Sequence, residues 1–269
     1  MSAMAPVCPG RFQPGPVMND LVKLALVAAC VCVASLATRR FGHAVGGTLG
    51  GLPMIAGPIT GFVMLANPVP TVQGIVLATL VCLPATMAHL LTFAWCALRW
   101  PWWLALLAAN MAFFALGLSL SLWPWSAWQA TLLVVLSLVL ANAAMPRRRV
   151  AAAAVRIPGV ELLCRVLVAM GVAWLIIRSA GVAPAAISGL LLAVPITGNV
   201  LPCFTRQGHG AAATVTLLRG FMRGLSGFVA FFLTLLWALD PMSPGAAYAT
   251  AWAVALAVAS ALYVWHRRR

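Results

Sequence analysis

The sequence predicts an all-α protein: a polytopic transmembrane helical bundle of about nine spans, arranged as two inverted-topology repeats with broken helices. Three observations predict this class. The composition is too apolar for a water-soluble domain, and apolar runs of membrane-spanning length alternate with short basic or turn-forming segments. The tetrapeptide Pro-Ile-Thr-Gly also occurs twice, each time inside an apolar segment.

The composition requires the lipid bilayer as the main partner of the chain. Its 269 residues are 64% hydrophobic and 7% charged, with a mean hydropathy of +1.03, whereas soluble domains carry roughly 25% charged residues. The net charge of +14 does not indicate nucleic-acid binding, because the basic residues fall mainly in short loops between apolar runs. Most of the seven cysteines lie inside those runs and no C-x-x-C pair occurs, as expected for small hydrophobic residues.

Nine segments are long and apolar enough for transmembrane helices, which need about 20 residues each. Residues 1–19 precede them and are expected to form a disordered tail. The fourth segment is the clearest, because tryptophans, which prefer the membrane interface, stand at both of its ends. The predicted spans are 20–38, 44–66, 71–97, 101–122, 126–145, 158–178, 182–204, 209–239 and 244–265.

Basic residues follow the odd-numbered spans, and the loops on the other side contain none. Cytoplasmic loops are enriched in Lys and Arg, so this asymmetry predicts an extracytoplasmic N-terminus and a cytoplasmic C-terminus. It also favours an odd number of spans. The residues are Arg39, Arg40, Arg99, Arg147, Arg148, Arg149, Arg156, Arg206, Arg267, Arg268 and Arg269; the loops without them lie near 67–70, 123–125, 179–181 and 240–243.

The two halves of the chain resemble one another. Pro58–Gly61 recurs unchanged as Pro195–Gly198, 137 positions later, and residues 20–28 resemble residues 161–169. The prediction is a first repeat at 20–125 (spans 1–4), a connecting fifth span and basic loop at 126–157, and a second repeat at 158–269 (spans 6–9). Five spans separate equivalent helices, which inverts the second repeat in the membrane. Chance similarity between Ala-, Leu- and Gly-rich helices is the alternative.

The repeated tetrapeptide predicts a broken helix in each half. Proline removes a backbone donor and glycine adds freedom, and such a break is tolerated in a membrane only inside protein or beside a wet cavity. Half-helix ends there could bind an anionic group or a cation, although a simple proline kink repaired by threonine is the alternative. The candidate solute-binding residues at the breaks are Pro58, Thr60, Gly61, Pro195, Thr197, Gly198 and Asn199.

Three further side chains are candidates for solute contacts. Arg219 and Arg223 lie one helical turn apart in the eighth span and could offset the charge of an anionic solute. The alternative is that both reach the cytoplasmic interface along a tilted helix. His89 is the only histidine deep in a predicted span, where a helix–helix hydrogen bond is its alternative role.

No enzyme motif is present. The sequence contains no G-x-S-x-G, no H-E-x-x-H and no phosphate-binding Gly-Lys-Ser/Thr loop. Only three acidic residues occur, and no cluster of His or Cys has the spacing of metal ligands. The sequence therefore predicts no enzymatic activity, no cofactor and no metal site.

The first repeat, with Gly46-Gly47, Leu52-Pro53, Gly57-Pro58 and Gly61, resembles a pattern of bacterial inner-membrane proteins of unassigned function. The layout of two inverted halves is similar to drug/metabolite transporters and to sodium/bile-acid-symporter-like folds, which have ten helices as five plus five. This chain would lack the tenth helix. The resemblance implies a multi-pass protein of the bacterial inner (cytoplasmic) membrane and carries over no site residues.

Together these features predict a secondary transporter of a small polar or anionic solute that works by alternating access. The alternative is a membrane scaffold or assembly partner without transport activity, in which small residues pack helices between chains. A homodimer, in which a second copy of the chain completes the nine-span bundle, is a further alternative.

Overall fold

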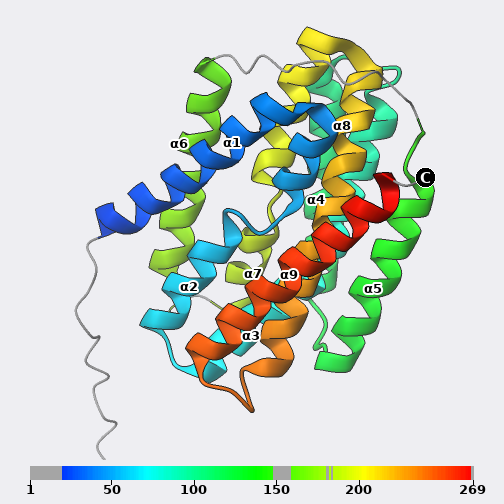
Figure 1. Cartoon of the computed structure of the whole chain (residues 1–269). Helices are drawn as coiled ribbons and strands as arrows, with labels where there is room; N and C mark the ends of the chain where they lie inside the picture. The colour runs from blue at the N-terminus through cyan, green and yellow to red at the C-terminus, as the bar shows by residue number, and fades with distance from the viewer. Residues whose placement is uncertain (1–19, 148–158, 180–181, 183, 268–269) are drawn as a thin grey trace, which may run out of the picture.

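The computed structural model describes residues 20–147, 159–179, 182 and 184–267, and the secondary structure of these residues is helical (Figure 1). The all-α prediction is therefore confirmed for this part of the chain. The predicted tail at 1–19, most of the basic loop at 148–158 and the terminal Arg268 and Arg269 lie outside it. The helices are α1 (Asp20–Gly51), α2 (Ala56–Ala66), α3 (Val69–Cys96), α4 (Trp102–Ser121), α5 (Ala127–Ala144), α6 (Gly159–Ser179), α7 (Ala185–Ala193), α8 (Ile196–Ala238) and α9 (Pro244–Arg267).

Several segments are long and apolar enough to cross a bilayer, as a multi-pass membrane protein requires. Within the described residues there are six: 46–66, 69–96, 102–121, 127–144, 185–238 and 244–262. A shorter apolar stretch at 162–175 lies in α6. The segment 185–238 has 54 residues, about 80 Å if it were a straight helix, against a hydrocarbon core of about 30 Å. The number of crossings and the repeat stay predictions.

Five predicted spans agree with helices to within two residues, namely those matching α3, α4, α5, α6 and α9. The first two do not, because α1 continues through the expected loop at 39–43 as one 32-residue helix. Arg is a good helix former, and a helical turn keeps its backbone hydrogen bonds satisfied near the membrane. Figure 1 shows the lighter blue last part of α1 turning away from its dark blue first part.

The seventh and eighth predicted spans meet at a sharp turn inside α8. Gly210 has φ 80° and ψ −179°, a backbone conformation that only glycine adopts readily. We refer to residues 196–209 as the first segment of α8 and to residues 211–238 as its second segment. The expected loop at 205–208 is helical, so the change of direction falls at this glycine instead.

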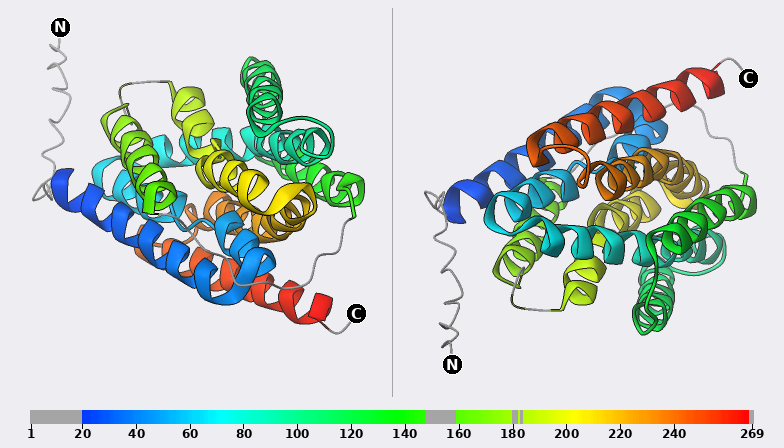
Figure 2. Two further views of the ribbon diagram at one scale, coloured as in Figure 1. Left: turned by 90° about the horizontal axis from the view of Figure 1, so that it is seen from above. Right: turned by 90° about the horizontal axis from the view of Figure 1, so that it is seen from below.

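Helices α3 and α8 form the centre of the bundle. In the apolar part of α3, 72% of residues are buried, against 17% in α5, which therefore lies at the periphery. Figure 2 shows α4 and α5 on one side of the bundle and α1 and α9 on the other. Buried Phe93, Phe231 and Phe232 fill the core between them.

Helix α1 crosses the second segment of α8 at glycines on both helices. A Cβ atom at Gly47 would overlap the Leu217 carbonyl, and one at Gly224 would come 2.8 Å from the carbonyl carbon of Thr48. Small residues let two backbones approach this closely, which is how membrane helices gain packing without a hydrophobic driving force. The crossing brings the end of α1 into the centre of the molecule.

Two hydrogen bonds show that α3 and the second segment of α8 run in opposite directions. Gln73, near the start of α3, donates to Asp240, just after the end of α8. At the other end, Nε of Arg206 in the first segment of α8 donates to the carbonyl of Ala97, which follows α3, over 2.9 Å. Helices α4 and α9 follow α3 and α8 respectively and pack against them.

Candidate functional site

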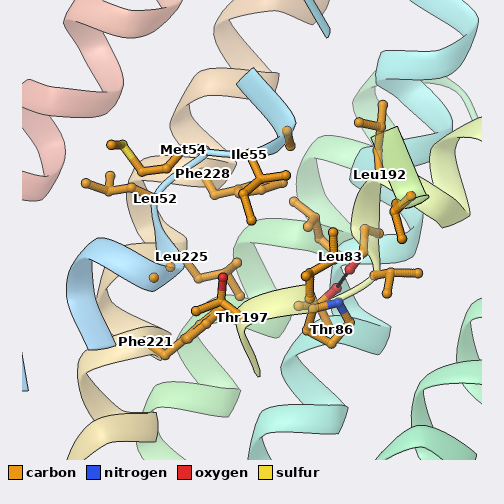
Figure 3. Close-up of a pocket in the computed structure, with 18 of the residues that line it drawn as sticks. Leu52, Met54, Ile55, Leu83, Thr86, Leu192, Thr197, Phe221, Leu225 and Phe228 are labelled. Carbon is orange, nitrogen blue, oxygen red and sulfur yellow. Dashed lines mark hydrogen bonds between the residues drawn. The ribbon is translucent and has the colours of Figure 1, made fainter. Parts of the chain in front are cut away.

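A cavity lies between the two places where helices are interrupted in the middle of the bundle (Figure 3). The space measures about 800 Å³ when the solvent at its open mouth is included. Its walls come from the end of α1, the start of α2, the break between α7 and α8, and the facing sides of α3 and α8. The described lining residues are Gly46, Leu49–Leu52, Met54–Ala56, Ile59, Leu83, Thr86, Val172, Leu191–Thr197, Phe221, Leu225 and Phe228.

The first interruption covers residues 52–55 and lies just before the tetrapeptide, so that Pro58 and Thr60 are already in α2. Pro53 has no amide hydrogen with which to extend α1. The amide of Met54 instead donates to the Leu52 carbonyl over 2.7 Å, and the amide of Gly57 donates to the Pro53 carbonyl over 2.7 Å. Pro58 falls in the first turn of α2, where a missing amide hydrogen costs little.

The second interruption is at Val194 and Pro195, immediately before α8 begins. Pro195 is the N-cap of α8, and the Asn199 amide donates to its carbonyl over 2.8 Å. The Ile196 amide turns back to the Val194 carbonyl over 2.8 Å. The break is therefore tighter than the first one and is hydrogen-bonded locally.

Helix α3 holds both sides of the second interruption. The Thr86 hydroxyl donates to the Ala193 carbonyl over 2.6 Å, which satisfies an acceptor at the end of α7. Nε2 of His89 lies 3.5 Å from the Gly198 carbonyl at the start of α8, while its Nδ1 has no hydrogen bond among the described residues. His89 is fully buried, and this contact joins α3 to the start of α8.

Helix α9 holds the start of α2 in a comparable way. The Tyr248 hydroxyl donates to the Gly57 carbonyl over 3.0 Å, and the Trp252 ring packs where a side chain at position 57 would lie. Gly61 packs against the same tyrosine. The Thr60 hydroxyl donates to the Ala56 carbonyl one turn earlier over 2.7 Å and is buried. Within the first tetrapeptide, Gly61 thus contacts α9, whereas Ile59 lines the cavity.

Of the predicted site residues, the structure brings Pro195 and Thr197 into the cavity wall. It also places residues there that the sequence did not single out: Phe221, Leu225 and Phe228 of α8 face the cavity together with Leu83 and Thr86 of α3. Their spacing puts the α8 residues on one helical face, opposite the arginines that the sequence singled out instead. The remaining predicted residues, Pro58, Thr60, Gly61, Gly198, Asn199 and His89, lie outside the lining.

Arg219 and Arg223 are half-buried and do not line the cavity. They are two residues away from Phe221, which is about 200° around the helix, so they lie on roughly the opposite side of α8. In this conformation neither arginine contacts the space between the two interruptions. The cavity therefore does not show how either arginine would offset the charge of an anionic solute.

No group of three or more metal-ligating side chains is present among the residues that the structure describes. The site accordingly offers hydroxyl groups, backbone amides and carbonyls, and apolar surface. Comparison with protein-family models, with curated proteins and with solved structures found no match, so the geometry of the chain alone carries the functional argument.

Proposed function

We propose that the protein is a secondary transporter that moves a small polar or anionic solute across a membrane by alternating access. The observation that carries the proposal is the cavity bounded by two interrupted helices, one from each half of the chain. Interrupted helices at a buried site are where transporters bind solutes, because the freed backbone groups need either protein or a ligand as partners.

The packing of the helices supports the predicted duplication. The interruption after α1 packs against α8, and the interruption after α7 packs against α3. In the proposed repeat α3 and the second segment of α8 are equivalent, so each interruption is held by the corresponding helix of the other half. The antiparallel course of these two helices is what an inverted repeat requires.

The proposed equivalence concerns whole helices rather than single side chains. Thr86 aligns with Arg223 in the repeat, yet Thr86 contacts the second interruption whereas Arg223 lies away from the cavity. We retain Arg219 and Arg223 as proposed solute contacts in another conformation of the transport cycle, because relative movement of the halves would change which faces line the pathway.

For the setting of this transporter we propose the bacterial inner membrane, with the N-terminus outside and the C-terminus in the cytoplasm. The support is the asymmetry of basic residues in the sequence, of which Arg39, Arg40 and Arg206 lie within helices of the structure. Fusion of green fluorescent protein to the C-terminus tests the orientation, because this reporter fluoresces in the cytoplasm and not when exported unfolded. A dark fusion of the intact protein would refute it.

The transport proposal is tested by screening the protein in lipid nanodiscs for thermal stabilisation by small carboxylates, inorganic phosphate, sugars and amides. A solute that binds the folded state raises the melting temperature by mass action. Any solute that does so is then tested for exchange in proteoliposomes. Gly50→Val places a side chain into the cavity wall, whereas Gly171→Val adds one in open space on α6.

The expected result is stabilisation and exchange that Gly50→Val removes and Gly171→Val keeps. Arg223→Gln reduces both if the solute is an anion. A folded protein that responds to no solute in the panel, or binding that Gly50→Val leaves unchanged, would favour the scaffold alternative. The tight glycine contacts at Gly47 and Gly224 are made within the chain, so they give that alternative no support.

A further inference from the structure

Thr197 carries a hydroxyl that its own helix does not satisfy. Threonines in helices usually donate to the carbonyl four residues earlier, and seven described threonines do so: Thr60, Thr79, Thr131, Thr205, Thr214, Thr216 and Thr234. For Thr197 that carbonyl belongs to Ala193, which already accepts from Thr86 over 2.6 Å. The Thr197 hydroxyl makes no hydrogen bond with any described residue.

This hydroxyl points into the cavity. A Cβ atom at Gly50 would come 3.0 Å from the Cγ2 methyl group of Thr197, so the methyl group faces α1. Figure 3 shows the oxygen of the labelled Thr197 directed into the space beside Leu225. The side chain therefore presents its polar atom to whatever occupies the cavity.

The Thr197 hydroxyl is a hydrogen-bond donor at this end of the cavity. Thr197 is in the first turn of α8, where the helix dipole is partly positive, while the amides of Ile196 and Asn199 already donate to the Val194 and Pro195 carbonyls. An occupant that places a hydrogen-bond acceptor here would satisfy the Thr197 hydroxyl.

The rest of the cavity is apolar and, among the described residues, carries no charged side chain. Leu52, Met54, Ile55, Leu83 and Phe228 form its walls. A charged group buried in such surroundings without a counter-ion is strongly disfavoured, whereas an apolar body gains by contact with these side chains. The arginines that could neutralise an anion lie on the other side of α8.

We propose that this cavity binds an uncharged molecule with a small apolar body and one hydrogen-bond acceptor, such as a short-chain ketone or ester. Thr197 donates the hydrogen bond that holds the acceptor. The inference rests on the proposed transport function and narrows its solute: the polar end of the solute is neutral, and in this conformation the arginines do not contact it.

The test compares binding of 2-pentanone and of pentanoate to the full-length protein in nanodiscs, by saturation-transfer NMR with empty nanodiscs as the reference for partitioning into lipid. The two probes have chains of the same length and differ in charge. Thr197→Val removes the hydroxyl at nearly constant volume, and Thr197→Ser keeps it. Thr205→Val is the matched control, because its hydroxyl is bonded to the Leu201 carbonyl on the same helix.

We expect 2-pentanone to bind and pentanoate to bind more weakly. Thr197→Val should weaken ketone binding roughly 3- to 10-fold, the effect of one neutral hydrogen bond, while Thr197→Ser and Thr205→Val keep it. Thr86→Val should also weaken it, because it frees the Ala193 carbonyl to accept from Thr197. Tighter binding of pentanoate that depends on Arg223 would overturn the inference and leave the transport proposal standing. Absence of binding by either probe to folded protein overturns the inference, and the solute panel then decides the transport proposal separately.

Discussion

Replacing Gly224 with alanine tests the close crossing of α1 and α8 that brings the two interruptions together. The added Cβ atom would overlap the Thr48 carbonyl oxygen and lie 3.0 Å from the Cα atom of Gly51. Both are backbone atoms, so no side-chain rotation can relieve the contact. The helices must move apart or bend.

Two opposing effects set the size of the change. Overpacking a tight site costs about 1–3 kcal/mol, while replacing a mid-helix glycine with alanine gains up to about 1 kcal/mol of helix propensity. We expect Gly224→Ala to lower the free energy of unfolding by roughly 1–2 kcal/mol. Gly171→Ala in α6 meets nothing within 4 Å, so it should be neutral or raise that free energy by up to about 1 kcal/mol.

The assay is reversible unfolding of both variants and the parent in mixed micelles with increasing SDS. The informative outcome is that the two substitutions change the free energy of unfolding in opposite directions, because a general effect of alanine on membrane insertion would change it in the same direction in both variants. Equal or greater stability of Gly224→Ala compared with Gly171→Ala would refute the close crossing. Loss of ligand response in Gly224→Ala alone would further link the crossing to the cavity.

Two other predictions concern the core and a helix end. Phe93→Ala should lower the free energy of unfolding by about 2–3 kcal/mol, below the usual range because the side chain is transferred to lipid rather than water. Leu132→Ala should cost less, since the side chain of Phe93 is 0% exposed and that of Leu132 is 69% exposed. Unfolding in SDS measures both variants, and equal losses would contradict the proposed core. Ser126→Ala removes the reciprocal hydrogen bonds with Gln129 at the start of α5 and should lower the stability of that helix end by about 1 kcal/mol. The loss should appear as faster hydrogen exchange in the first turn of α5, and unchanged exchange there would contradict a stabilising cap.

The sequence located most helices because their ends are marked by chemistry that acts locally. Pro101 stands before α4 and Ser126 caps α5, and apolar runs of about 20 residues separate such signals. It failed at 39–43, where two arginines suggested a loop and the helix continues instead. The change of direction at Gly210 depends on a positive φ, which one residue type permits but does not impose.

The candidate site was predictable only in part. The tetrapeptide identified Pro195 and Thr197, because a proline lacks the backbone donor that would extend the preceding helix. Phe221 and Leu225 were missed because the polar face of α8, with Arg219 and Arg223, was expected to contact the solute. Leu83 was missed because α3 is apolar on nearly every side. Which face of α8 lines the cavity is decided by its packing against α1 and α3.

The two tetrapeptides show which features follow from the local sequence and which depend on the tertiary structure. Their identical sequences do not mark identical interruptions: Pro195 stands at the break before α8, whereas Pro58 lies in the first turn of α2, after an interruption at 52–55. The tertiary structure makes the two threonines different. Thr60 remains bonded to the carbonyl of its own helix, whereas Thr86 from α3 occupies the carbonyl that Thr197 would otherwise use. A hydrogen-bond acceptor taken by a distant residue cannot be seen in the local sequence, and it is this contact that leaves a free hydroxyl in the cavity.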